Sequence, residues 1–338
     1  MIKLLFFSHA HHGSQVITGF YRLCNAFRVH LKIENHSKDS SYPDFRGVYL
    51  IVECNQKVLV YDMSDGYQYP DEIQWFLDRC DFYFKRSFSK EYNRCFFNDN
   101  PKIHPYGFNY QVTYKKNPLD GPYYKVLAKK LLQYPQNSNF LTEVFEGIPS
   151  YTKNPKILFS VRLWPQDSSL SPVLNRERSY INDCRITIVK SLKEKYQDNF
   201  VGGLYDNQIA RELAPELIIS PKLTSRKQYL KTMHQCDICI ASMGLHESIG
   251  GKMGEYVAAA KSIVSEKLHY SIPGQFIDGI NYLSFEQPNE CIAQVDKLYN
   301  NHDLLYRMKV ENAIYYQNYL KPEVLIANTL HVADIHIG

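Results

Sequence analysis

The chain has 338 residues, a length that suits two domains and is too long for one compact core. Hydrophobic residues make up 44% and charged residues 22%, ordinary globular values that exclude wholesale disorder. The formal net charge of +4 is only mildly basic, so we expect no nucleic-acid partner, although such a charge suits anionic small molecules.

The cysteines and the apolar runs indicate a cytoplasmic protein. Most of the eight cysteines stand singly inside apolar stretches, as buried thiols do. Cys236 and Cys239 form one close pair without the second pair that a zinc site needs, so we expect no metal site. No apolar run approaches the length of about 18 residues that spans a membrane, which leaves peripheral contact with the inner membrane face as the only membrane role we consider.

The first half of the chain predicts a domain over residues 1–150 in which short strands outnumber helices. Strands are expected at 3–8, 29–33, 48–52, 58–61 and 82–84 and at Ile103, with helices at 71–79, 123–133 and 140–147. A hairpin turn is expected between the third and fourth strands. The polar, proline-bearing stretch 150–155 is read as the boundary of this domain.

The second half alternates regularly between strands and helices, from residue 151 to residue 320. Strands are expected at 156–161, 200–201, 217–219, 237–241, 263–265 and 282–285, and helices at 174–196, 225–235, 251–260, 290–299 and 302–319. This alternation predicts a parallel doubly wound sheet. Residues 321–338 predict a further helix that starts at Pro322 and packs back on the first domain.

The most informative stretch runs from a strand near Cys239 through a glycine-bearing loop into a helix. In a doubly wound sheet such a loop opens into the ligand crevice. Gly250 and Gly251 allow close backbone approach, the helix N-terminus favours an anion, and Lys252 adds a cation, so a diphosphate is the expected occupant. Glu247 and Glu255 would repel a phosphate and are therefore expected to bind hydroxyl groups of a sugar and a ribose.

With seven residues between Glu247 and Glu255, followed by an alanine-rich helix and a strand, residues 156–330 resemble the retaining GT-B glycosyltransferases that use nucleotide sugars. The resemblance is greatest to a bacterial subgroup that builds surface polysaccharides. It implies an α/β GT-B fold, in which two Rossmann-like domains face a central cleft. It also implies that Glu247 contacts the donor sugar, while Ser248, Gly250, Gly251 and Glu255 bind the donor nucleotide.

The same family carries an arginine after the first strand of this domain and a lysine five residues later, both on the diphosphate. Arg162 stands at the arginine position, whereas Asp167 occupies the position of the lysine. We therefore expect Lys252 to supply the second positive charge beside Arg162. Arg185, on the long helix 174–196, is expected to lie on a solvated face with other charged residues.

Polar residues that follow strands of the first domain are the expected contacts on the acceptor side of the cleft. They are His11, His12, Asp62, Asp65, Lys85, Arg86 and His104. Turn chemistry and solvated loops explain the same residues equally well.

The resemblance implies a metal-independent glycosyltransferase without a cofactor. It would take a nucleoside diphosphate sugar as donor and a glycan or lipid-linked molecule as acceptor, with retention, in the synthesis of lipopolysaccharide, capsule or another surface polysaccharide. Two other functions stay open: a non-catalytic nucleotide- or sugar-binding protein, which Asp167 favours, and a nucleotide-sugar epimerase of the same fold. The residues do not identify the sugar, the base, the acceptor or a catalytic base.

Overall fold

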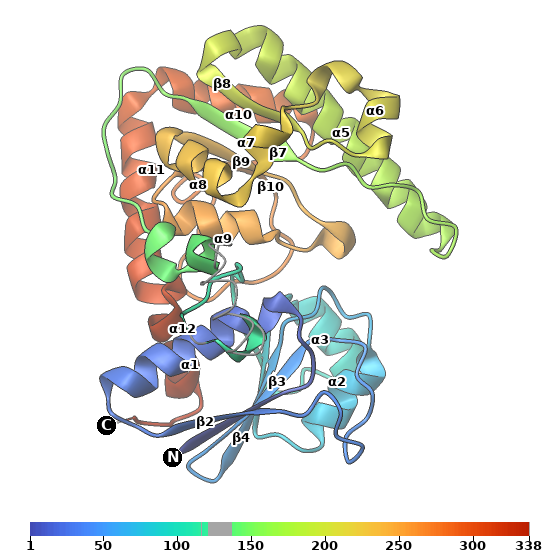
Figure 1. Cartoon of the computed structure of the whole chain (residues 1–338), viewed down its shortest axis with the longest axis vertical. Helices are drawn as coiled ribbons and strands as arrows, with labels where there is room; N and C mark the ends of the chain where they lie inside the picture. The colour runs from blue at the N-terminus through green and yellow to red at the C-terminus, as the bar shows by residue number, and fades with distance from the viewer. Residues whose placement is uncertain (116, 121–136, 338) are drawn as a thin grey trace, which may run out of the picture. The chain divides into compact units, whose positions relative to one another are not determined.

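The computed structural model describes residues 1–115, 117–120 and 137–337, and its chain forms two compact units (Figure 1). Unit 1 comprises Met1–Phe145, His269–Gln275 and Tyr315–Gly338, and unit 2 comprises Glu146–Leu268 and Phe276–Ile314. The expected stretch 151–320 thus contains two segments that belong to unit 1, His269–Gln275 and residues 315–320. The helix expected at 123–133 lies outside the described residues.

Unit 1 is built on a six-stranded sheet in the order β2-β1-β3-β4-β5-β6. Its strands are β1 (Ile2–Phe6), β2 (Leu31–Asn35), β3 (Tyr49–Cys54), β4 (Lys57–Asp62), β5 (Phe82–Lys85) and β6 (Ile103–Pro105). Neighbouring strands are parallel except where β3 pairs with β1 and β4. The predicted β3–β4 hairpin is confirmed: Asn55 and Gln56 form its turn with φ of 49° and 63°.

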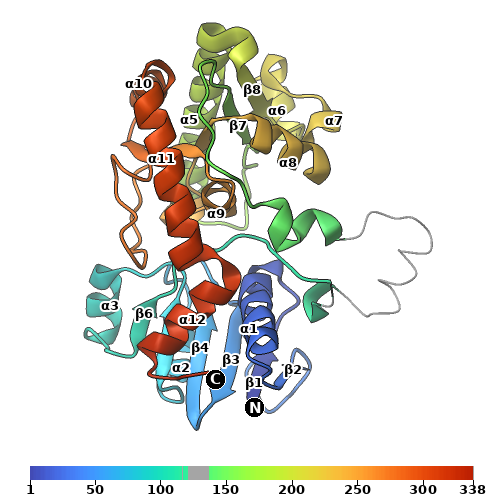
Figure 2. The same ribbon diagram turned by 90° about the vertical axis from the view of Figure 1, so that its left-hand side faces the viewer.

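Helices cover both faces of this sheet: α1 (Ser14–Ala26) and α12 (Pro322–Val332) on one, α2 (Pro70–Leu77) and α3 (Lys90–Phe97) on the other (Figures 1 and 2). Two adjacent residues of β4 contact helices on opposite faces, because successive side chains of a strand point to opposite sides of the sheet. Val60 joins the core that contains Phe76 of α2. Tyr61 packs edge-on against Phe20 of α1 and hydrogen-bonds Thr329 of α12 at 2.8 Å.

The contact between α1 and α12 depends on a glycine. A Cβ atom at Gly19 would lie 2.4 Å from the carbonyl oxygen of Pro322 and 2.4 Å from Cγ1 of Ile326. Only glycine leaves room for the two helix backbones to approach this closely. Beyond α12, the Lys57 ammonium donates to the carbonyl of Ala333 at 2.7 Å, so the last described residues also pack on unit 1.

Unit 2 is built on a fully parallel sheet in the order β11-β10-β9-β7-β8. Its strands are β7 (Ile157–Val161), β8 (Phe200–Leu204), β9 (Ile238–Ala241), β10 (Ser262–Glu266) and β11 (Leu283–Phe285). β8 lies on one side of β7, and β9, β10 and β11 lie on the other, as in doubly wound folds with the strand order 2-1-3-4-5. The predicted α/β fold class with two Rossmann-like domains is confirmed.

The helices of unit 2 again form two layers (Figure 1). They are α5 (Pro172–Tyr196), α6 (Gln208–Leu213), α7 (Pro221–Thr224), α8 (Arg226–Gln235), α9 (Gly251–Ala258), α10 (Pro288–Asn300) and α11 (His302–Tyr315). One core joins Phe159 of the sheet to Ile188 of α5 and Val295 of α10, and α8 and α9 cover the opposite face. Unit 2 therefore leaves the carboxyl ends of β7, β8 and β9 at one edge, where the loops to α5, α6 and α9 begin.

Two predicted elements are wrong. Instead of a helix at 140–147, the chain forms 3-10 turns at Asn137–Phe140 and Thr142–Val144, because the extended Leu141 makes a parallel bridge with Thr113. Instead of a strand at 217–219, it forms the 3-10 turn Pro215–Leu217, followed by a single bridge between Ile218 and Leu204. Isolated bridges provide too few ladder hydrogen bonds to extend either segment.

All eight cysteines are free, and only Cys95 is exposed. Within residues 1–115, 117–120 and 137–337, no helix has both the length and the apolar character needed to cross a bilayer.

Candidate functional site

In unit 2, residues from several elements meet at the carboxyl ends of β7, β8 and β9, where ligands of doubly wound sheets bind. Arg162 follows β7, Tyr205 follows β8, and a loop over residues 242–250 follows β9 and leads into α9. The charged groups that surround Tyr205 show that these elements are neighbours in space. Burial raises the pKa of its phenol, the charge of Glu255 on α9 raises it further, and the charges of Arg226 and Arg162 oppose that rise.

The N-terminus of α9 offers positive potential at this edge. Gly250 precedes the helix in an extended conformation, no side chain caps the helix, and its first turn carries no acidic residue. The first backbone N–H groups of a helix lack partners within that helix, and the helix dipole favours an anion there. An anionic ligand is therefore favoured at the first turn, where Gly251 and Lys252 stand.

Lys252 lies deeper than a solvated surface lysine. Its ammonium donates to the carbonyl oxygen of Ser160 on β7 and lies 5.2 Å from the ring centroids of both Tyr205 and Tyr229. Burial lowers its pKa to about 8; the carboxylate of Glu255 opposes this shift, and the charge of Arg185 adds to it. Its charge is therefore present at neutral pH and lost in mildly alkaline solution.

Glu255, one turn further along α9, is 5% exposed. Arg226, the first residue of α8, donates from Nη2 to Oε1 of this carboxylate at 2.8 Å. The second oxygen, Oε2, is buried without a hydrogen-bond partner among the described residues. A buried carboxylate oxygen without a partner is costly, and a hydroxyl group of a ligand would satisfy it.

Glu247 occupies a different environment, in the loop between β9 and α9. It is exposed, and together with His246 it adopts a left-handed backbone, with φ of 56° for Glu247 and 58° for His246. Two consecutive non-glycine residues in this region are strained, and such strain concentrates at functional sites. Ser248 follows, buried at 4% exposure, and its carbonyl accepts the N–H of Gly244 at 2.9 Å.

Asp167 lies in the loop that precedes α5. Its carboxylate accepts the N–H and hydroxyl of Ser169 at 3.0 Å and 2.6 Å and lies 4.0 Å from the guanidinium of Arg178. These hydrogen bonds lower its pKa, so the carboxylate is charged at neutral pH. Asp167 therefore supplies no positive charge at the position where the resemblance implies a lysine.

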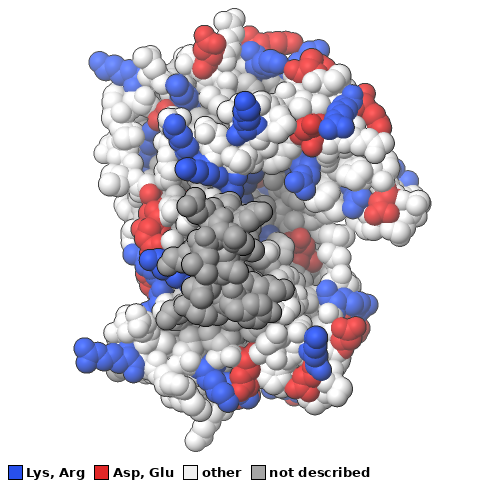
Figure 3. Space-filling view, in the orientation of Figure 1, with Lys and Arg blue, Asp and Glu red and all other residues white. Residues whose placement is uncertain are grey.

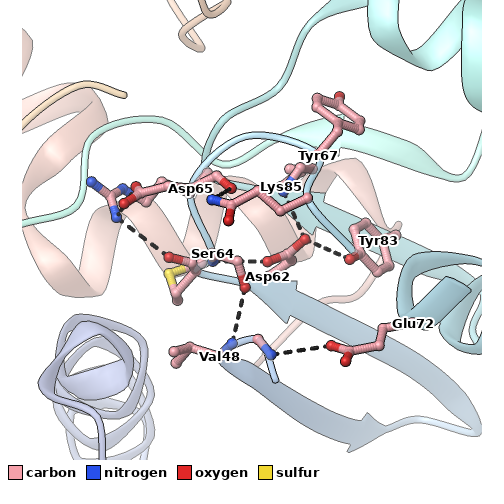
Figure 4. A network of polar contacts seen from close by, with 12 residues as sticks. Val48, Asp62, Ser64, Asp65, Tyr67, Glu72, Tyr83 and Lys85 are labelled. Atoms are coloured by element: carbon pink, nitrogen blue, oxygen red, sulfur yellow. Dashed lines mark hydrogen bonds and ion pairs between the residues drawn. The ribbon is translucent and has the colours of Figure 1, made fainter. Parts of the chain in front are cut away.

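In unit 1, a polar network lies at the carboxyl ends of β4 and β5 (Figure 4). The Asp62 carboxylate accepts from the Lys85 ammonium at 2.8 Å, from the Tyr83 hydroxyl at 2.6 Å and from the Ser64 N–H at 2.8 Å. Asp62 and Lys85 are both 0% exposed. In this conformation they hold the strand ends together, and neither side chain meets solvent.

The other residues expected on the acceptor side lie at two places in unit 1. Arg86 is 8% exposed and pairs with the half-exposed Asp65 at 2.9 Å, while His11 and His12 are exposed on the short helix before α1. His104, on β6, lies between the rings of Phe82 and Phe84, 5.7 Å from each centroid. His104 therefore lies on the strand that pairs with β5, next to the strand end that carries Lys85.

Three residues of the unit 2 cluster were missed by the sequence analysis: Tyr205, Arg226 and Tyr229. Tyr205 follows the strand that contains Gly202 and Gly203. Its position directly after a strand is the one signal from which the sequence could predict a site residue there. Arg226 and Tyr229 lie on one face of α8, and no motif in the sequence relates that helix to α9. Only the tertiary structure brings them together.

The described residues, 1–115, 117–120 and 137–337, contain no group of three or more histidine, cysteine, aspartate or glutamate side chains that could hold a metal ion. Lys, Arg, Asp and Glu side chains are interspersed on the face of each unit that Figure 3 shows.

No protein-family model matches the chain, and no curated protein matches it either. Among solved structures, it is similar to a glycosyltransferase from Rickettsia africae ESF-5, with 12% identity, a TM-score of 0.47 and coverage of 92% of this chain and 78% of that one. It is also similar to the C-terminal domain of LpcC, a glycosyl transferase group 1 family protein from Francisella tularensis, with 13% identity, a TM-score of 0.33 and coverage of 52% and 95%.

A third similar structure is a point mutant of TarM from S. aureus in complex with fondaparinux, alpha-GlcNAc-glycerol and UDP, with 9% identity and a TM-score of 0.42. This likeness covers 78% of the present chain but 46% of TarM, so the chain spans less than half of that protein. At such identities and scores, likeness in fold gives the chain no function.

Proposed function

We propose that this protein is a glycosyltransferase that binds a nucleoside diphosphate sugar in unit 2 and transfers its sugar to a glycan or lipid-linked acceptor. The observation that carries the proposal is Glu255, one turn beyond the uncapped N-terminus of α9, whose buried Oε2 has no hydrogen-bond partner within 1–115, 117–120 and 137–337. A ribose hydroxyl satisfies that oxygen, and the helix N-terminus then faces the diphosphate that follows the ribose.

The charges around this position suit the departure of a diphosphate. Arg162, Lys252 and the first turn of α9 supply positive potential, and none of the three needs to move a proton for the leaving group to be stabilised. We propose that they share the charge that grows on the diphosphate as the glycosidic bond breaks. Glu247, on its strained loop, is proposed to contact the donor sugar.

On this proposal the sugar retains its anomeric configuration, the reaction uses no cofactor and no metal, and the product belongs to a bacterial surface polysaccharide. These finer statements rest on the Glu247–Glu255 motif and its resemblance. His11, His12, Asp65 and Arg86 are proposed to serve the acceptor side of unit 1 directly. The expected direct contact by Asp62 and Lys85 is wrong in this conformation, because both side chains are fully buried, so these two and His104 are proposed to act by holding the strand ends. Unit 2 is proposed as the donor domain, and unit 1 with α12 as the acceptor domain.

One observation favours a second function. Asp167 places a carboxylate, paired with Ser169 and Arg178, where the family has a phosphate-binding lysine. A protein that binds the nucleotide sugar without transferring it would tolerate this change.

The test is a thermal-shift screen of UDP-, GDP- and TDP-sugars, followed by an assay of nucleotide release with and without candidate acceptors. A ligand that binds only the folded chain raises its melting temperature in proportion to the logarithm of ligand concentration. Glu255→Ala should abolish the shift, and Glu194→Ala, an exposed glutamate on α5, should preserve it. A shift without nucleotide release would support the second function, and no shift with any donor would refute both.

A further inference from the structure

Arg185, on α5, is a buried arginine that the sequence placed on a solvated helix face. It is 7% exposed. Its guanidinium donates from Nη1 to the carbonyl of Arg162 at 2.6 Å, from Nε to the hydroxyl of Ser242 at 3.1 Å and from Nη2 to the carbonyl of Met243 at 3.0 Å. The expectation of a solvated Arg185 is therefore wrong, because the side chain is buried where β7 and β9 end and hydrogen-bonds the residues that follow these strands.

These three acceptors belong to two different loops. Arg162 begins the loop after β7, and Ser242 and Met243 begin the loop after β9, which carries Glu247 and leads into α9. β7 and β9 are adjacent strands, so their loops start side by side. One guanidinium thus joins the backbone of Arg162 to the start of the loop that carries Glu247.

The same loop is fixed at two further points. Glu177, two turns before Arg185 on α5, accepts the backbone N–H of His246 at 2.8 Å, and Glu266, at the end of β10, accepts the N–H of Met243. The strained left-handed pair His246–Glu247 lies directly beyond these contacts. Such a backbone persists only where its surroundings over-determine it.

The guanidinium suits this role better than other side chains. Its planar fork presents several donors in fixed directions, whereas the ammonium of a lysine is a single compact charge. All three acceptors of Arg185 are neutral, and its burial lowers its pKa to about 10, with the carboxylate of Glu266 opposing the shift. A buried cation with neutral acceptors costs free energy to desolvate, which a purely packing role would not require.

We propose that Arg185 is a positioning residue that fixes Arg162 relative to the loop carrying Glu247, so that the groups for the diphosphate and for the donor sugar keep one separation. This inference rests on the proposed function of unit 2. Arg185 acts through Arg162, Ser242 and Met243 and does not itself touch the donor.

The experiment compares the full chain with Arg185→Gln, Arg185→Lys and Arg176→Gln. Arg176 is an exposed arginine on the same helix and serves as the matched control. Hydrogen exchange without ligand follows peptides covering 161–165 and 242–248. Calorimetry then measures the affinity for the nucleoside diphosphate that binds the wild type best and for the corresponding monophosphate.

We expect faster exchange in both loops together for Arg185→Gln and Arg185→Lys, and no change for Arg176→Gln. Affinity for the diphosphate should fall at least about tenfold in both Arg185 variants, with a smaller loss for the monophosphate, because the second phosphate depends on both loops. The lysine variant also keeps the test decisive if the glutamine variant does not fold.

Three outcomes would overturn the inference. Unchanged exchange in either loop would show that Arg185 does not couple them. Faster exchange with unchanged diphosphate affinity would make the residue merely structural. An Arg185→Lys variant that matches the wild type in both measurements would show that charge alone is sufficient. If the wild type binds no nucleoside diphosphate, the proposed function fails, while the exchange measurement still decides whether Arg185 couples the loops.

Discussion

Arg226 holds one oxygen of the Glu255 carboxylate at 2.8 Å and leaves the other oxygen buried without a partner among the described residues. The arginine comes from the start of α8 and the glutamate from the first turns of α9, so a tertiary contact orients the carboxylate. The ion pair fixes which oxygen is available to a ligand.

Glu255→Gln is the most direct test of that orientation. The amide keeps the size of the side chain but removes its charge and half of its accepting capacity, so nucleoside diphosphate affinity should fall about tenfold or more. Calorimetry with UDP, GDP and TDP measures the change, and circular dichroism checks the fold. Unchanged affinity for every nucleotide that binds the wild type would remove Glu255 from the site.

Lys252 predicts how nucleotide affinity depends on pH. Because its folded pKa is lowered from 10.5 to about 8, the ammonium loses its proton as pH rises through 8, and affinity for a diphosphate should decline there. Lys252→Arg should keep its affinity up to about pH 10, since an arginine stays charged. Calorimetry from pH 6.5 to 9.5 tests this, and an alkaline decline that persists in the arginine variant would assign it to another group.

The same shift has a consequence for stability. The unfolded chain holds the Lys252 proton more tightly than the folded chain, so between about pH 8 and pH 10.5 the unfolded state binds more protons. The contribution of this residue to the free energy of unfolding should therefore rise with pH across that window. Urea titrations of the wild type and Lys252→Met measure the difference, which should be flat below pH 8.

Arg162→Ala should lower turnover more than donor affinity. Its side chain is exposed next to Tyr205, and negative charge on a diphosphate grows as the glycosidic bond breaks, so the arginine has more to stabilise in the transition state than in the ground state. Steady-state kinetics with the donor found by screening separate kcat from KM. An intact kcat with a raised KM would make Arg162 a binding residue only.

Glu247→Gln should distinguish the sugar from the nucleotide. Glu247 lies on the strained loop before α9 and is proposed to contact the donor sugar, so affinity for the bare nucleoside diphosphate should stay within about twofold while affinity for the nucleotide sugar falls. Calorimetry with both ligands makes the comparison. Equal losses for the two ligands would contradict the assignment.

Gly19→Ala tests the packing of α12 on α1. In an exposed helix interior this change stabilises by about 1 kcal/mol, but here the new methyl group would meet Pro322 and Ile326 at 2.4 Å. We expect a net loss of about 1–3 kcal/mol in the free energy of unfolding, measured by urea titration.

Ending the chain at Leu320 should expose Tyr61 and Phe20 and lower solubility. A truncated chain that melts like the full one would refute the role of α12.

The sequence by itself determined the fold class and much of the local structure. Alternation of strands and helices after residue 156 predicts the parallel sheet of unit 2, because each strand is a short apolar run and each helix has its own apolar spacing. The turn at Asn55–Gln56, the proline at the start of α12 and the glycines at the start of α9 are likewise local signals. The two glycines place Glu247 on a loop and Lys252 and Glu255 on the helix that follows it, without any knowledge of their neighbours.

Only the tertiary structure decided what those residues contact. Lys252 meets Ser160, Tyr205 and Tyr229 because β7, β8 and α8 converge on α9, and none of these lies near it in the chain. In the sequence, Arg185 resembles any charged residue of a long helix. In the structure, α5 packs on the sheet and the Arg185 guanidinium hydrogen-bonds three acceptors in two loops. Periodicity records which face of an element is apolar, whereas hydrogen bonds between distant segments depend on how the layers pack, and no short-range pattern encodes that.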